Sequence, residues 1–106
     1  MKRIAFALLL AAPVAHAGWF GPSDYAECLL ANLPGTENDV VARQLIARCF
    51  QEFPLGLDNI EKRAGWLAKY PDQRSCVIKE AKNTKSLIAA QLISQACFHL
   101  YEPVNP

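Results

Sequence analysis

The sequence predicts an all-α fold in which two disulfide-stapled helical hairpins, joined by a short bridging helix, share one core. Apolar residues recur at helical spacing through most of the chain, and no stretch shows the apolar–polar alternation of a strand. Four cysteines stand in two equally spaced pairs: Cys28 and Cys49 are 21 positions apart, and so are Cys76 and Cys97. Helical periodicity and the repeated cysteine spacing together predict the two hairpins.

The N-terminal segment has the features of a secretory signal peptide. Two basic residues precede an uncharged apolar run over residues 4–12, and a small-x-small cleavage pattern ends at Ala17. The apolar run is shorter than the roughly 17–25 residues that a membrane-spanning helix needs. We therefore expect removal of residues 1–17, which leaves residues 18–106 as a single helical four-cysteine domain.

The expected signal peptide has two consequences: its removal changes the charge of the protein, and the export that it directs places the protein outside the cytoplasm. The full chain has 106 residues and a formal net charge of +1, and loss of the two basic residues leaves nine basic against ten acidic side chains. Such a balance argues against a nucleic-acid binder, whose affinity depends on many phosphate contacts. No second apolar run has membrane length, so we expect no transmembrane segment after cleavage. The expected location is the periplasm or the exterior of a bacterial cell, where cysteines normally pair.

An internal repeat organises the mature chain. When the sequence is shifted by 48 positions, the two cysteine pairs coincide and further residues match without a gap. The matches are Thr36 with Thr84, Ala42 with Ala90, Phe50 with Phe98, Leu29 with Val77, Leu30 with Ile78, Val40 with Ile88, Leu45 with Ile93 and Phe53 with Tyr101. We interpret the two segments, about residues 22–54 and 71–102, as tandem copies of one unit.

The first copy predicts a hairpin of two helices. Asp24, with Glu27 three residues later, has the spacing of a capping box, and Pro34 with the glycine after it ends this helix. Polar residues at 36–39 are suited to cap the second helix, and Pro54 stops it. The expected apolar faces consist of Tyr25, Cys28, Leu29 and Leu33 in the first helix, and of Ala42, Leu45, Ile46, Cys49, Phe50 and Phe53 in the second.

The second copy has weaker boundaries. Asp72 follows a proline at the start of its first helix, and Asn83-Thr84 replaces the Pro-Gly break, with Thr84 as the expected N-cap of the last helix. Because this break is soft, one long kinked helix is an alternative. The expected apolar faces consist of Cys76, Val77 and Ala81 in the first helix, and of Ile88, Ala89, Leu92, Ile93, Ala96, Cys97 and Leu100 in the last.

Between the copies, residues 55–70 are expected to form the bridging helix, about three turns long. Asp58 and Glu61 have capping spacing at its start. Its short amphipathic face would consist of Ile60, Ala64, Leu67 and Ala68.

Each cysteine lies on the apolar face of its helix, which favours the pairs Cys28–Cys49 and Cys76–Cys97. An antiparallel hairpin can bring two Cα atoms to the roughly 4.4–6.8 Å that a disulfide needs. The predicted turn is nearer to Cys28 than to Cys49, so a crossed arrangement between the hairpins stays open. A redox catalyst would carry Cys-x-x-Cys, and a structural zinc site would carry closely spaced thiolates; the sequence has neither pattern. We expect no metal, no cofactor and no catalytic residue.

Three aromatic residues are candidate contacts with a protein partner. Trp19 and Phe20 lie between glycines near the mature N-terminus, where they could dock on the core, which we favour, or bind a partner, since aromatic residues dominate binding hot spots. Trp66 on the bridging helix has the same two interpretations, with a core position favoured.

Three lysines and one histidine are further candidate sites. Lys79, Lys82 and Lys85 recur every three residues and could bind phosphate or acidic lipid, but Glu80 interrupts them and favours a solvated helix end. His99 is expected at the surface or at the edge of the core.

The segments Tyr25-Ala-Glu-Cys28-Leu-Leu30, Gly35-Thr36, Asp39, Ala42 and Cys49-Phe-Gln-Glu-Phe-Pro54 resemble a family of small exported bacterial four-cysteine helical proteins of uncharacterised function. Members often begin with a Gly-aromatic-aromatic-Gly-Pro-Ser segment, as residues 18–23 do. The second copy departs from the pattern, because it has Leu87 where the first has Asp39. The resemblance implies an exported helical protein with four cysteines, and it carries over no catalytic residue, ligand or partner.

The expected function is that of a non-enzymatic protein-interaction module of the bacterial envelope: an inhibitor, an immunity-type binder or an accessory subunit. Small size, rigidity and the lack of a catalytic motif in the sequence favour this hypothesis. The alternative is a periplasmic chaperone or envelope stress factor, which would expose apolar area conditionally. An enzyme with an unrecognised site ranks third.

Overall fold

Four α-helices make up most of the chain that the structure, a computed structural model, describes: residues 21–102. They are α2 (Tyr25–Asn32), α3 (Asp39–Glu52), α4 (Gln73–Glu80) and α5 (Leu87–Tyr101), with a short 3₁₀ helix, η1 (Gly65–Leu67), between α3 and α4. No residue of the described range lies in a strand, so the all-α class is confirmed. The expected signal peptide over residues 1–17, together with Trp19 and Phe20, lies outside the described residues.

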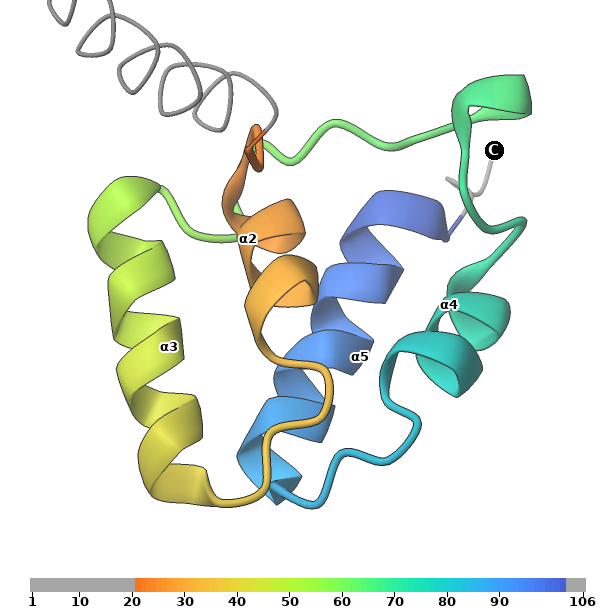
Figure 1. Cartoon of the computed structure of the whole chain (residues 1–106). Coiled ribbons are helices and arrows are strands. Elements are labelled where there is room, and N and C mark those ends of the chain that lie inside the picture. The colour runs from red at the N-terminus through yellow and green to blue at the C-terminus, as the bar shows by residue number, and fades with distance from the viewer. Residues whose placement is uncertain (1–20, 103–106) are drawn as a thin grey trace, which may run out of the picture.

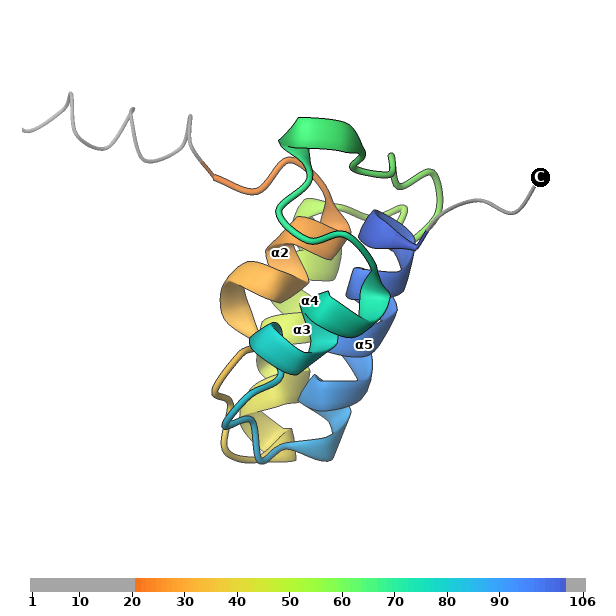
Figure 2. The same cartoon turned by 90° about the vertical axis from the view of Figure 1, so that its right-hand side faces the viewer.

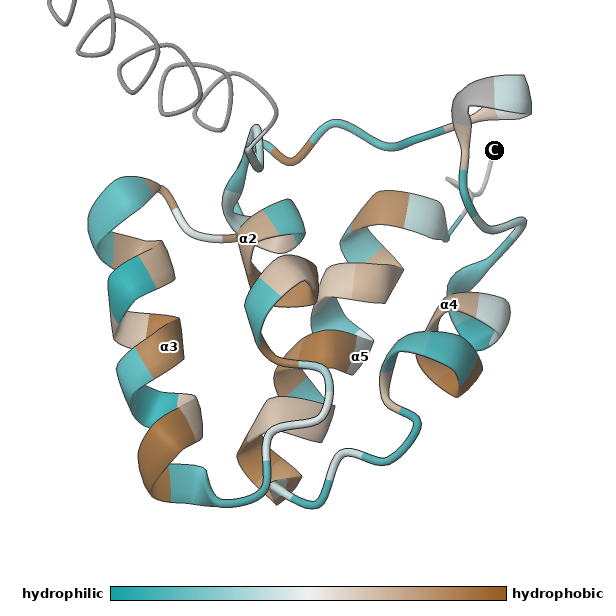
Figure 3. Cartoon of the chain, viewed as in Figure 1, coloured by the Kyte–Doolittle hydropathy of each residue, from teal (hydrophilic) through white to brown (hydrophobic). Residues whose placement is uncertain are grey.

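Helix α5 is the centre of the arrangement. It packs against α2, α3 and α4, whereas α4 packs mainly on α5. Figure 1 shows α3 and α4 on opposite sides of the α2–α5 pair. In Figure 3, α5 is the most apolar of these helices, while α3 and α4 carry more hydrophilic residues. The helix that is apolar on most sides thus lies where it has most neighbours. Within residues 21–102, no helix combines the length and apolar character needed to cross a membrane.

Every one of these four helices begins at a side-chain cap. The capping residues are Asp24, Asn38, Asp72 and Ser86, and each side chain accepts a hydrogen bond from the backbone N–H three residues later. Such a bond satisfies one of the N–H groups that a helix start leaves unpaired. The cap expected at Thr84 is therefore wrong. Its hydroxyl accepts a hydrogen bond of 2.8 Å from the backbone N–H of Gly35 in the other hairpin instead.

The core is formed by thirteen buried apolar residues. They are Tyr25, Ala26, Cys28, Leu29, Leu33, Ala42, Cys49, Cys76, Ala89, Ile93, Ala96, Cys97 and Leu100. They form one cluster, which confirms the shared core. The expected burial of Phe50 is wrong, because α3 is a peripheral helix and this side chain lies at its edge, 52% exposed. Its ring packs edge-to-face on Tyr25, with the centroids 6.1 Å apart.

The two hairpin turns interlock at one end of the molecule. Gly35 and Asn83 have positive φ angles of 83° and 63°, the left-handed conformation that ends a helix and turns the chain. The backbone N–H of Ser86 donates to the carbonyl of Thr36 at 3.0 Å, and its hydroxyl donates to Asp39 Oδ1 at 2.6 Å. The break at Asn83 is thus a sharp turn, and the alternative of one long kinked helix is wrong.

Both favoured disulfides are present, Cys28–Cys49 and Cys76–Cys97, each with a Cα–Cα distance of 5.7 Å. The crossed arrangement is therefore wrong. The cysteines of the first pair lie level although the turn is nearer to Cys28, because the loop over residues 33–38 runs down beyond the end of α2 before α3 begins (Figure 1). Extended residues rise about 3.3 Å each and helical residues 1.5 Å, so a few loop residues match several helical ones.

The bridging helix expected over residues 55–70 is wrong. Gly56, Asn59 and Gly65 all have positive φ angles, and left-handed residues interrupt an α-helix. Only η1 is helical there, and it has three residues. We call residues 53–72 the link segment. It crosses the end of the helical bundle opposite the two hairpin turns, as the side views in Figures 1 and 2 show.

Candidate functional site

Arg63 fixes the link segment on the helical bundle. Its guanidinium Nη2 lies 3.1 Å from Asp24 Oδ2 and 2.5 Å from Glu27 Oε2, and Nη1 donates to the carbonyl of Glu61. Its backbone N–H donates to the carbonyl of Leu100 at 2.8 Å. One residue therefore joins the link segment both to the start of α2 and to the end of α5.

The charge of Arg63 also affects the ionisation of Glu27. Partial burial of this carboxyl disfavours its charged form, but hydrogen bonds from Arg63 and Ser23 outweigh the burial and hold its pKa below the ordinary value. The same carboxylates raise the pKa of the Arg63 guanidinium against the opposing effect of its burial. The ion pair between Glu27 and Arg63 is thus charged on both sides at neutral pH.

Lys62 adds a second attachment to the end of α5. Its Nζ lies 3.2 Å from the carbonyl oxygen of Phe98 and 3.3 Å from that of His99. The Phe98 carbonyl also accepts the N–H of Glu102, and the carbonyls at the end of a helix carry partial negative charge, so an ammonium group there is stabilising. His99 itself is half-buried, with its ring packed edge-to-face on Phe98, which agrees with its expected place at the core edge.

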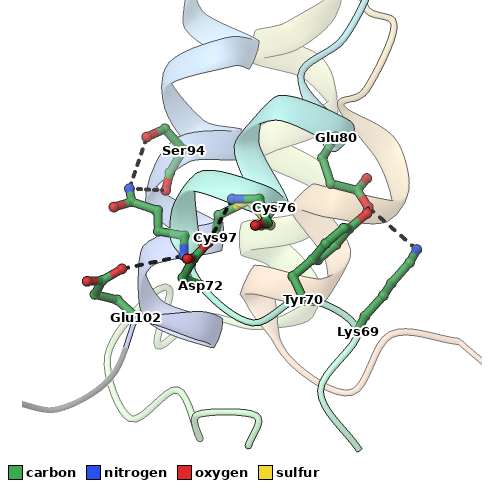
Figure 4. The surroundings of a disulfide bond; sticks show 10 residues. Lys69, Tyr70, Asp72, Cys76, Glu80, Ser94, Cys97 and Glu102 are labelled. Atoms are coloured by element: carbon green, nitrogen blue, oxygen red, sulfur yellow. Dashed lines mark hydrogen bonds and ion pairs between the residues drawn. A yellow bond between two sulfur atoms is a disulfide. The ribbon is translucent and has the colours of Figure 1, made fainter.

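A polar cluster joins the other end of the link segment to α4. The Tyr70 hydroxyl donates to Glu80 Oε2 at 2.5 Å, and Lys69 Nζ lies 3.5 Å from the same oxygen (Figure 4). Burial of the Tyr70 phenol raises its pKa well above the ordinary value, and the hydrogen bond to the Glu80 carboxylate raises it further. The Tyr70 ring packs edge-to-face on Tyr101, with the centroids 5.4 Å apart. The phenol therefore remains a protonated hydrogen-bond donor at neutral pH.

Trp66 protrudes from the link segment between these two attachments. It lies on η1 and is 91% exposed. The favoured core position of Trp66 is therefore wrong, because the segment that carries it crosses the end of the bundle instead of packing a helical face on the core. The outcome is a large exposed aromatic side chain on a segment that Arg63 and Tyr70 fix on either side.

A cavity of about 620 Å³ lies beneath the same segment. Its walls include the rings of Tyr70 and Tyr101 and the cations Lys62, Arg63 and Lys69. Each of these cations already has a partner within the chain, a helix carbonyl or a carboxylate. The cavity is thus lined by aromatic residues and by cations that already have partners within the chain.

The four cysteines serve the fold. All are paired, and within residues 21–102 no cysteine is free and no group of His, Cys, Asp and Glu side chains is arranged to hold a metal ion. Near Cys76–Cys97, Gln73 Nε2 donates to the carbonyl and hydroxyl oxygens of Ser94 at 3.1 and 3.2 Å, and the Gln73 N–H donates to Glu102 (Figure 4). These bonds hold the start of α4 on α5 beside the disulfide.

Sequence reasoning missed Arg63 and Tyr70. The partners of Arg63 on α2 are 36 and 39 positions away, and that of Tyr70 is 10 positions away, so no short motif or periodicity marks them. Of the expected partner contacts, the structure places Trp66 at an exposed site, whereas Trp19 and Phe20 lie outside the described residues.

Comparison of the chain with protein-family models, with curated proteins and with solved structures found no match.

Proposed function

We propose that this chain is an exported, non-enzymatic protein-interaction module of the bacterial envelope, either an inhibitor, an immunity-type binder or an accessory subunit, and that it contacts its protein partner through Trp66. The observation that carries the proposal is the 91% exposure of Trp66 on a segment anchored at Arg63 and Tyr70. Tryptophan is enriched among the residues that dominate binding energies. Because the segment is already ordered, less conformational entropy is lost when a partner binds.

The covalent framework supports the export that the proposal includes. Two disulfides in so small a chain are typical of oxidising, extracytoplasmic compartments. The proposal also includes a tandem origin of the two hairpins and membership of the four-cysteine family that the first hairpin resembles. Equal cysteine separations and left-handed turn residues at Gly35 and Asn83, 48 positions apart, support the tandem origin.

A periplasmic chaperone is the second candidate, and one observation favours it. Large apolar side chains are exposed at several places besides the link segment, among them Val40, Ile78 and Leu87, each about two-thirds exposed. Apolar side chains exposed on several elements would let a chaperone contact different unfolded chains, although singly exposed apolar residues are also ordinary on a protein surface. A chaperone would therefore bind many proteins, whereas an inhibitor or accessory subunit would bind one.

The two candidates separate in a capture experiment with residues 18–106. We compare the wild-type chain with Trp66→Ala and with Leu87→Ala, which removes an exposed apolar side chain far from the link segment. In extract of the producing bacterium's periplasm, the wild type and Leu87→Ala should retain one stoichiometric protein, which is then purified for affinity measurement. Trp66→Ala should weaken its binding about 30-fold or more, the effect of a hot-spot residue.

Circular dichroism and intact disulfide masses show whether the variants are folded. An unchanged affinity of folded Trp66→Ala would overturn the role of this residue. The chaperone would be favoured instead if the chain captured many proteins and if an added unfolded polypeptide released them by competition.

A further inference from the structure

Charge is divided unevenly between the two halves of the described chain. Residues 21–61 contain seven acidic and two basic side chains, a net charge of −5, whereas residues 62–102 contain seven basic and three acidic side chains, a net charge of +4. The near-neutral total therefore conceals an acidic α2–α3 half and a basic half that includes α4. Separate interactions of the basic half are possible although the whole chain is almost uncharged.

The excess positive charge gathers around α4. Arg74, Lys79, Lys82 and Lys85 are all exposed, and the ion pairs of the described part of the chain involve Arg63 and Lys69 instead of these four. Ile78 lies among them and is 67% exposed. We call these five residues the basic face.

Helical geometry explains why Arg74 and Ile78, one part of the basic face, point away from the bundle. Lys79, three positions after Cys76, lies at the side of α4, and Lys82 and Lys85 lie in the segment between α4 and α5. Cys76 is fully buried in its disulfide, and residues two positions before and after it, Arg74 and Ile78, lie about 160° from it around the helix axis. Helix α4 packs mainly on α5, and Figure 2 shows it on the outside of the bundle, facing the viewer. The outer side of α4 thus has no neighbouring helix among the described elements.

The acidic residue that interrupts this basic run in the sequence is turned away from it in space. Glu80 points toward the link segment, where its Oε2 accepts the Tyr70 hydroxyl and lies beside Lys69 (Figure 4). In the folded chain Glu80 is therefore paired with Tyr70 and Lys69 and not with Lys79 or Lys82.

We propose that the basic face docks the protein on an anionic lipid membrane surface. Its four exposed cations match the negative surface potential of anionic lipids, which attracts each lysine or arginine near the surface. The exposed Ile78 provides an aliphatic side chain for the boundary between headgroups and acyl chains. The proposed protein-binding surface at Trp66 is a different one, so either proposal can fail without the other.

Vesicle sedimentation tests the membrane proposal. Purified residues 18–106 are mixed with vesicles of equimolar phosphatidylcholine and phosphatidylglycerol, or of phosphatidylcholine alone. Binding should require phosphatidylglycerol and should fall steeply between about 0.05 M and about 0.5 M NaCl, because salt screens exposed charges. Each cation near the surface contributes about fivefold in affinity, so Lys79→Glu/Lys82→Glu should weaken binding about 25-fold or more.

The control is Arg43→Glu/Arg48→Glu, which changes the net charge equally but on exposed positions of α3. This control should weaken binding far less than the α4 double variant. The proposal is overturned by absence of binding to phosphatidylglycerol vesicles, by equal losses in the two double variants, or by binding to polyglutamate without binding to vesicles, which would identify an acidic protein as the ligand.

Discussion

Removal of the Cys76–Cys97 disulfide is expected to destabilise the whole protein and to release α4 locally. Closing a loop of about 22 residues stabilises a fold by about 3 kcal/mol in the chain-entropy account. Cys28–Cys49 has the same separation of 21 positions, so its entropic contribution should be equal. The neighbouring helices differ, however, because α3 packs on both α2 and α5, whereas α4 packs mainly on α5.

The assay compares Cys76→Ala/Cys97→Ala with the matched variant Cys28→Ala/Cys49→Ala. Urea unfolding followed by circular dichroism should show a loss of about 3 kcal/mol in the free energy of unfolding for each. Native-state hydrogen exchange should show faster exchange in residues 73–80 of the first variant, through an opening that costs less than global unfolding. In the second variant, these amides should exchange no faster than the global loss of stability predicts.

Two results would refute this reasoning. A loss below about 1 kcal/mol for Cys76→Ala/Cys97→Ala would show that the loop-closure argument fails for this hairpin. Unchanged local protection of α4 would show that the hydrogen bonds between Gln73 and Ser94 suffice to hold it on α5. The two loops do not overlap, so removing both disulfides should cost about 6 kcal/mol, close to the whole stability of so small a domain.

Two further predictions concern the link segment and a hairpin turn. Arg63→Met should lower the free energy of unfolding by about 1 kcal/mol at neutral pH, because the ion pairs it removes are partly exposed. The folded-state pKa of Glu27 lies below its ordinary value of 4.5, so the wild type should lose this contribution as the pH falls from 4.5 through the folded-state pKa. Urea unfolding at several pH values should therefore show that the free energy of unfolding depends less on pH in Arg63→Met than in the wild type. A stronger fall of the free energy of unfolding at acid pH in the variant than in the wild type would contradict this role of Arg63. Gly35→Ala should cost about 1–2 kcal/mol because φ is +83°, although nothing lies within 4 Å of the added methyl group; an unchanged thermal midpoint would contradict this.

The helices and disulfides could be predicted from the sequence because local chemistry specifies them. Asp24 and Asp72 are capping residues by type and position, and the left-handed turn at Gly35 uses the residue that adopts it at lowest cost. The cysteine spacing favoured the observed pairs. Their level placement, however, depends on the extended path of residues 33–38, which no periodicity reveals.

The link segment shows where local pattern fails. The apolar residues from Ile60 to Ala68 have helical spacing, yet the backbone there is mostly irregular. The end of α5 offers the carbonyls of its last turn, and the Arg63 N–H binds that of Leu100 while the Lys62 ammonium binds that of His99. Acceptors from a distant part of the chain thus outweighed a weak local preference.

The sequence by itself determined the all-α class, the helix starts at Asp24 and Asp72, and the most favourable disulfide pairs, because each depends on residues within one or two helical turns or on a repeated spacing. Only the tertiary structure decided that Trp66 is exposed, that Arg63 anchors the link segment and that Glu80 faces Tyr70. Those outcomes depend on charges and hydrogen-bonding groups that only folding brings together, and their interactions are strong enough to position side chains that the local sequence leaves free.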